Sequence, residues 1–115
     1  VLGRQQMVLD MALPAVRDYL YERISALLRD NAIDYIKWDH NRVLPMQDAA
    51  QTRGTYALLA RLHDTFPLVE IESCASGGGR IDFGIMQHTQ RVWLSDSNDA
   101  KERLRTPLPH IWPRP

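Results

Sequence analysis

The sequence of 115 residues is poor in several features, and each shortage excludes a class of protein. Its single cysteine, Cys74, has no partner for an internal disulfide, so nothing indicates an oxidising compartment. Lys and Arg together number 14, as do Asp and Glu, and no block of like charge occurs. A nucleic-acid partner recognised by a basic surface therefore loses its main support. No apolar run approaches the roughly 20 residues that span a bilayer. We expect a cytoplasmic protein with no membrane association.

A hydrophobic content of 44% is normal for a globular protein, and the apolar residues follow an alternation of helices and strands. Helical spacing runs from Pro14 to Arg29 and from Ala49 to His63. Short apolar stretches that fit strands run from Ile33 to Trp38, from Leu68 to Ser73 and from Arg91 to Ser95. This order predicts an α/β fold with parallel strands and right-handed crossover helices. An open doubly wound sheet and part of a (β/α)₈ barrel fit equally well.

Two aspartates follow predicted strands, at the end where α/β enzymes keep their chemistry. Lys37 precedes Asp39 on the same side of its strand, so its ammonium favours an ionised carboxylate and is suited to hold a sugar hydroxyl. Asp96 follows Trp93 and Leu94, which offer an apolar wall. This asymmetry predicts a glycosidase pair with Asp39 as nucleophile and Asp96 as acid/base. Aspartates that cap the next helix fit the same positions.

A glycine cluster, Gly77 to Gly79, follows the second predicted strand and Cys74. Successive glycines let the backbone approach a ligand or adopt positive φ. A phosphate cradle is a minor alternative, because the P-loop ending and the dinucleotide fingerprint are both missing. Cys74 fits either a nucleophile or a small apolar filler.

The remaining candidates carry weaker signals. Four histidines are too scattered for a zinc signature, so we expect no metal or other cofactor. Trp38 is a candidate for stacking on a sugar, although core packing explains such a tryptophan equally well. The scattered histidines are His40, His63, His88 and His110.

Three blocks carry most of the candidate residues. They read DYIKWDHNR at 34–42, ESCASGGGRID at 72–82 and WLSDSNDA at 93–100. In order and spacing the blocks resemble those of bacterial-type α-galactosidases of glycoside hydrolase family 36. The resemblance covers about Gly3 to Leu104. It implies a retaining mechanism that releases terminal galactose from α-galactosides of the melibiose and raffinose type, with no cofactor and a full-length homo-oligomer.

The resemblance also implies roles for single residues. Asp39 stands at the nucleophile position and Asp96 at the acid/base position. The matching sugar-contacting positions are Lys37, Asn41, Cys74 and Gly77. Residues 1–105 are expected to form the central part of a (β/α)₈ barrel, and residues 106–115 a Pro-rich irregular tail.

The resemblance does not extend to the family's whole length. Its paired pocket aspartates and tryptophan have no counterpart after Val1, and we expect a missing N-terminal portion and a truncation or frame change near Leu104. An inactive or sugar-binding fragment and a galactosyltransferase of the raffinose-synthase kind therefore stay open. The isolated chain is expected to expose sheet edges and to be poorly stable or to aggregate.

Overall fold

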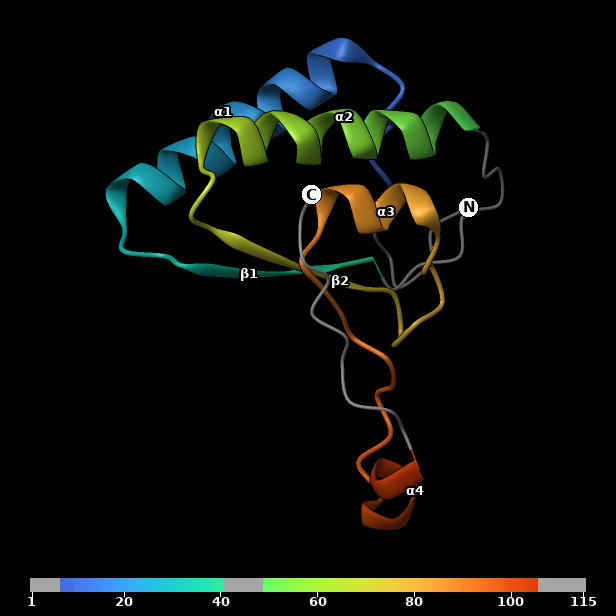
Figure 1. The fold of residues 1–115 in the computed structure, drawn as a ribbon. Coiled ribbons are helices and arrows are strands. Elements are labelled where there is room, and N and C mark those ends of the chain that lie inside the picture. The colour runs from blue at the N-terminus through green and yellow to red at the C-terminus, as the bar shows by residue number, and fades with distance from the viewer. Residues whose placement is uncertain (1–6, 41–48, 106–115) are drawn as a thin grey trace. The chain divides into compact units, whose positions relative to one another are not determined.

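The computed structural model describes residues 7–40 and 49–105 (Figure 1). Its elements in chain order are α1 (Pro14–Asp30), β1 (Tyr35–Asp39), α2 (Ala49–Thr65), β2 (Glu70–Cys74), α3 (Phe83–His88), β3 (Arg91–Val92) and α4 (Ala100–Arg105). They belong to two compact units, one holding α1 and α2 and the other holding the three strands with α3 and α4. The predicted α/β fold with parallel strands is confirmed.

In the first unit, α1 begins and ends at residues that the sequence marks. Pro14 lies at the start of the helix. Its missing N–H costs nothing there, because the N–H groups of the first turn have no acceptor within the helix. Asn31 ends the helix in extended backbone, and its side-chain amide donates to the Leu27 carbonyl at 2.9 Å. The predicted helix stop at Asn31 is therefore confirmed.

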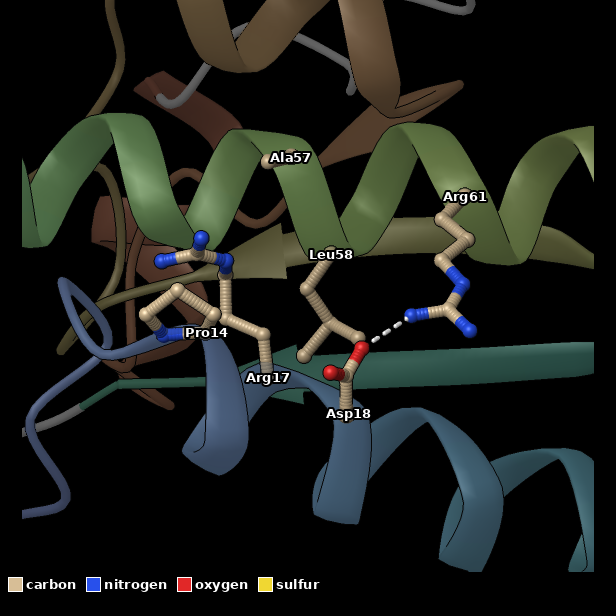
Figure 2. Close-up of a pocket in the computed structure, with 6 residues that line it drawn as sticks. All are labelled: Pro14, Arg17, Asp18, Ala57, Leu58 and Arg61. Carbon is tan, nitrogen blue, oxygen red and sulfur yellow. Dashed lines mark hydrogen bonds and ion pairs between the residues drawn. The ribbon is translucent and has the colours of Figure 1, made fainter.

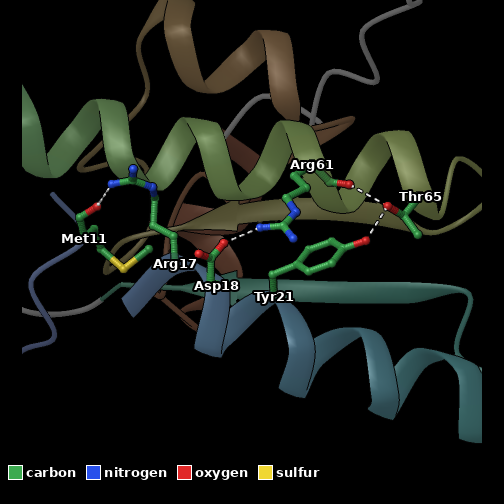
Figure 3. Close-up of polar contacts among 6 residues, drawn as sticks. All are labelled: Met11, Arg17, Asp18, Tyr21, Arg61 and Thr65. Atoms are coloured by element: carbon green, nitrogen blue, oxygen red, sulfur yellow. Dashed lines mark hydrogen bonds and ion pairs between the residues drawn. The ribbon is translucent and has the colours of Figure 1, made fainter. Parts of the chain in front are cut away.

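The helices α1 and α2 lie side by side and point the same way (Figures 1 and 3). Arg61 donates to the Asp18 carboxylate at 2.6 Å, and the Tyr21 hydroxyl is 2.8 Å from the Thr65 hydroxyl. Asp18 precedes Tyr21 in α1, and their partners Arg61 and Thr65 follow in the same order in α2, so the two helices are parallel. An exposed ion pair contributes only about 0–1 kcal/mol, so burial of α2 leucines contributes more. These leucines are Leu58, Leu59 and Leu62.

The second unit is built on a parallel sheet in the order β1-β2-β3. β1 and β2 pair over their full length, so Asp39 lies opposite Cys74 where both strands end. β3 pairs with the other side of β2, with Val92 opposite Ser73. The carboxyl ends of all three strands therefore lie along one edge.

The two faces of this sheet differ in chemistry, because side chains alternate along each strand. One face, called the polar face below, carries Tyr35, Lys37, Asp39, Glu70, Glu72, Cys74, Arg91 and Trp93. On this face Arg91 donates to Glu70 at 2.8 Å. Burial, together with a hydrogen bond to Glu72, raises the pKa of Tyr35 to about 12. The opposite face carries apolar residues such as Ile36, Ile71 and Val92.

The strands differ from the predicted segments at their ends. β1 and β2 begin later than predicted, because the ladder starts where the Glu70 amide donates to the Asp34 carbonyl at 2.9 Å. The third predicted strand is too long. The Trp93 amide still donates to β2, but the residue after β2, Ala75, donates its amide to the Gly77 carbonyl at 2.9 Å. The pairing partner changes there from a strand to a loop, which ends β3 at Val92.

Two short helices, α3 and α4, were not predicted. The Asp82 carboxylate accepts from the Ile85 amide at 2.8 Å, and the Asp99 carboxylate accepts from the Glu102 amide at 2.9 Å. Each aspartate thus caps a helix in the usual way. A helix of six residues is too short to show helical periodicity in the sequence.

The packing of α2 against Met11 yields a stability prediction. A Cβ at Gly54 would lie 1.9 Å from the Met11 carbonyl oxygen, which also accepts from Arg17 at 2.7 Å (Figure 3). In an open helix alanine is favoured over glycine by about 1 kcal/mol. Here we expect Gly54→Ala to lower the free energy of unfolding by about 1–3 kcal/mol in a urea titration. The exposed Thr52→Ala in the same helix is the control, with no expected loss. Equal stability of Gly54→Ala and the wild type would contradict this close packing.

Candidate active site

Three predicted site segments lie on adjacent strands at the carboxyl edge of the sheet, within the second unit. β1 ends at Asp39 and β2 at Cys74, directly opposite one another. Main-chain bonds continue past the strands, from the His40 amide to the Cys74 carbonyl at 2.9 Å and from the Trp93 amide to the Ser73 carbonyl at 2.8 Å. The parallel order thus brings the segments of Asp39, Cys74 and Asp96 to one edge.

The Cys74 thiol joins two of the predicted site residues. It is 3% exposed, it donates to the Asp39 carboxylate, and its sulfur accepts from the Gly77 amide. Burial, with the hydrogen bond to Asp39, raises the pKa of the Cys74 thiol above its ordinary value. A thiol that keeps its proton is a poor nucleophile. The arrangement favours Cys74 as a hydrogen-bond donor to Asp39.

The turn after Cys74 requires a glycine at position 77. Gly77 has φ +83, and a Cβ there would lie 2.9 Å from the Ser95 Cα atom and 3.0 Å from the Leu94 carbonyl oxygen. Both the conformation and the close approach of Leu94 and Ser95 therefore exclude a side chain. Gly77 thus has a structural role beside any contact with a sugar.

The amides of the glycine cluster are used within the protein. Gly77 donates to Cys74, Gly78 to Leu94 at 3.1 Å and Gly79 to Ala75 at 3.3 Å. A phosphate cradle needs N–H groups that point at the ligand. The alternative of a phosphate site loses support, because these three amides join segments of the protein.

Trp93 connects Lys37 of β1 to Asp96. Its indole N–H donates to the Asp96 Oδ1 atom at 2.7 Å. The Lys37 Nζ atom lies 4.1 Å from the centroid of the Trp93 ring, and the guanidinium carbon of Arg103 lies 4.8 Å from it. The apolar wall expected beside Asp96 also supplies a donor, because the turn between them brings the carboxylate to the polar edge of the indole. The helix cap in this segment is Asp99.

One predicted substrate contact, Trp38, is not brought to this cluster. Alternation along β1 puts the half-buried Trp38 on the face opposite Lys37 and Asp39. Asn41 lies outside the described residues. Sugar contacts by Trp38 and Asn41 stay predictions, as do the catalytic roles of the two aspartates.

Sequence reasoning missed several polar neighbours of the cluster. Glu72 is 6% exposed and lies opposite Lys37 in the sheet, where it accepts from Tyr35. Arg80 lies near enough to His40 to lower its pKa. Side chains alternate along the paired strands, and this alternation could have indicated that Glu72 lies on the same face as Lys37. Arg80 lies in a loop, where no such period applies.

A groove in the first unit is a separate feature (Figure 2). It has a volume of about 200 Å³ and is lined by Pro14, Arg17, Asp18, Ala57, Leu58 and Arg61. Its charged groups bind one another or main-chain carbonyls: Arg61 pairs with Asp18, and Arg17 donates to the carbonyls of Met11 and Ala12. The groove holds no predicted site residue.

Residues 7–40 and 49–105 show no group of three His, Cys, Asp or Glu side chains that could hold a metal ion. Within the same ranges no helix has the length and apolar character needed to cross a membrane. The expected lack of a cofactor, the cytoplasmic location and the homo-oligomer stay predictions.

Known proteins match both the sequence and the fold. An α-galactosidase of Escherichia coli is 50% identical over 108 residues, which cover 88% of this chain and 15% of the relative. The crystal structure of an α-galactosidase from Lactobacillus brevis is 44% identical with a TM-score of 0.81, covering 90% of this chain and 16% of that one. A variant of a family GH36 α-galactosidase from Geobacillus stearothermophilus, in complex with raffinose, is 34% identical with a TM-score of 0.78 and the same two coverages. The α/β fold and the similarity to these proteins thus identify the chain as a relative of the glycosidases.

The family is also defined by a sequence model. The model described as Melibiase matches residues 1–108, and the chain belongs to this family. The resemblance to α-galactosidases of glycoside hydrolase family 36 is confirmed. The chain spans about 15% of the length of the curated relatives it matches.

The surroundings of His40 give a pH prediction. Burial, and then the charge of Arg80, lower the pKa of His40 below its ordinary value, although the Asp39 carboxylate opposes this. The folded protein therefore binds this proton less tightly than the unfolded chain. The resulting stability is present above about pH 6.5 and is lost as the pH falls. We expect the wild type to lose more free energy of unfolding than His40→Gln between about pH 7.5 and about pH 5.5, measured in urea. Parallel losses in the two proteins would rule out this role of His40.

Proposed function

We propose that the protein hydrolyses α-galactosides and releases terminal galactose with retention of configuration. One observation carries this proposal: the Asp39 and Asp96 segments leave the carboxyl edge of one parallel sheet, each contacted by a neighbouring side chain. Relatives named α-galactosidases support the reaction, and a related enzyme in complex with raffinose supports the substrate class. The substrates are small oligosaccharides with a terminal α-linked galactose.

In the first step, an Asp39 oxygen attacks the anomeric carbon while the glycosidic C–O bond breaks. Protonated Asp96 gives its proton to the departing oxygen, and the galactosyl group becomes an ester of Asp39. In the second step, ionised Asp96 takes a proton from water, and the resulting hydroxide displaces Asp39 from the anomeric carbon. Asp39 is then ionised and Asp96 protonated, as at the start.

The neighbours of Asp39 suit a nucleophile. The Cys74 thiol donates to the carboxylate and orients it. Lys37 lies on the same face of β1 as Asp39. An ammonium carries three N–H donors, and a ring contact leaves others for sugar hydroxyls. We assign the sugar contacts on this face to Lys37, Cys74 and Gly77.

We infer that the sheet is part of a (β/α)₈ barrel, with residues 1–105 as its central part. In such barrels one face of each strand points to the interior, and the active site lies at the carboxyl ends. The polar face fits the interior side, and its candidate groups gather at that end. The parallel direction of α1 and α2 fits two consecutive strand-helix units. Residues 106–115, the expected tail, lie outside the described residues.

Substitution of the two carboxylates tests the proposed roles. Asp39→Asn is expected to lower hydrolysis of an aryl α-galactoside by at least about a thousandfold, because the nucleophile is lost. Asp96→Asn is expected to lower raffinose hydrolysis by about 10²–10⁴-fold, because a sugar leaving group needs a proton. Release of chromophore and of galactose measures both effects.

Asp99→Asn is the matched control in the acid/base segment. Asparagine caps a helix about as well as aspartate does, so activity is expected to stay near that of the wild type. Unchanged hydrolysis by folded Asp39→Asn would overturn the assignment of the nucleophile. A folded wild-type chain that hydrolyses neither substrate would overturn the proposed function of this chain. Products linked to an added sugar acceptor would indicate transfer in place of hydrolysis.

A further inference from the structure

We infer that Trp93 is a positioning residue for Asp96 and that Lys37, on the nucleophile strand, holds the Trp93 ring. The inference rests on the proposed function, in which Asp96 is the acid/base. It assigns to Trp93 a task in both chemical steps, and it links the two halves of the site.

Asp96 needs a partner to fix its orientation. Its residue is exposed and lies in the irregular segment between β3 and α4. No helix or strand holds this position. The Trp93 indole N–H, at 2.7 Å from Oδ1, fixes one carboxylate oxygen and leaves Oδ2 for the substrate.

The chemistry of the indole suits an acid that later becomes a base. An indole N–H is a donor only, and it cannot exchange roles with its partner. When Asp96 carries a proton on Oδ2, Oδ1 is a carbonyl oxygen that accepts from Trp93. When Asp96 is ionised, Oδ1 accepts the same N–H. One contact therefore serves both states, and the carboxyl group does not have to turn between the two steps.

Trp93 is itself held at three places. Its amide donates to the Ser73 carbonyl at 2.8 Å, which fixes the main chain to β2. The Lys37 ammonium and the Arg103 guanidinium lie 4.1 Å and 4.8 Å from the ring centroid, within the range of cation–π contacts. Because Lys37 belongs to β1, the strand that ends at Asp39, a shift of β1 is transmitted to the ring that positions Asp96.

Two substitutions distinguish the effect of the indole N–H from the effect of the aromatic ring. Trp93→Phe keeps a ring for Lys37 and removes the N–H, whereas Trp93→Leu removes both. A positioning role for the acid/base predicts a loss that depends on the leaving group. We expect Trp93→Phe to lower kcat/KM for raffinose by about tenfold or more, and for a dinitrophenyl α-galactoside by less than about threefold. Trp93→Leu is expected to lose more on raffinose than Trp93→Phe. Unchanged raffinose hydrolysis by Trp93→Phe, or equal losses on both substrates, would overturn the inference.

A measurement on the chain without substrate tests the contact directly. The Trp93 indole N–H resonance is identified by its disappearance in Trp93→Phe. It is expected to move in Asp96→Asn, which replaces the carboxyl acceptor by an amide, and to stay in place in Asp99→Asn. Lys37→Met is expected to shift it as well, whereas Lys101→Met, at an exposed position of α4, is not.

The two measurements keep the two proposals distinguishable. An indole resonance that ignores Asp96→Asn overturns the positioning role, whatever the kinetics show. If Asp96→Asn shifts the resonance but the folded wild-type chain hydrolyses neither substrate, the contact is supported and the proposed function fails.

Discussion

The register of the parallel β1–β2 pair is the constraint on which the candidate site depends. It puts Asp39 opposite Cys74 at level strand ends, so that a thiol on one strand donates to a carboxylate on the next. Because side chains alternate with a period of two, a slip by one residue would exchange the two faces of β1. Lys37 and Asp39 would then lie with the apolar residues. Burial of Ile71 at 2% exposure opposes such a slip, since one face of the sheet is apolar and the other is charged.

Two short chains of contacts follow from this register. In the first, the Gly77 amide donates to Cys74, and the Cys74 thiol donates to Asp39. In the second, Lys37 contacts the Trp93 ring, and the Trp93 indole donates to Asp96. Each chain ends at one candidate carboxylate. Each carboxylate thus has a donor of its own, which suits a mechanism in which one attacks while the other transfers a proton.

The sequence predicted most of the fold, because α1, α2 and the strands are long or apolar enough to show a period. It predicted the family through three ordered blocks. It failed where contacts between segments decide the outcome. The bond of the Ala75 amide to Gly77 in place of a β3 carbonyl ends β3, and it cannot be read from local pattern. The N–H contact of Trp93 depends equally on a turn, so an apolar wall was expected where the structure has a donor. Short α3 and α4 depend on single caps, Asp82 and Asp99.

The exposure of the candidate groups links the proposed barrel to the proposed chemistry. Lys37, Asp39 and Asp96 are exposed in the described part of the chain, and charges in water interact weakly. A carboxylate and an ammonium act more strongly on a sugar when protein replaces water around them. Further strands that close the sheet into a barrel would cover the polar face and leave its carboxyl end open. Closure would then strengthen the electrostatic contacts of Lys37 and Asp39 without moving these residues, because the register of β1 and β2 already sets their positions.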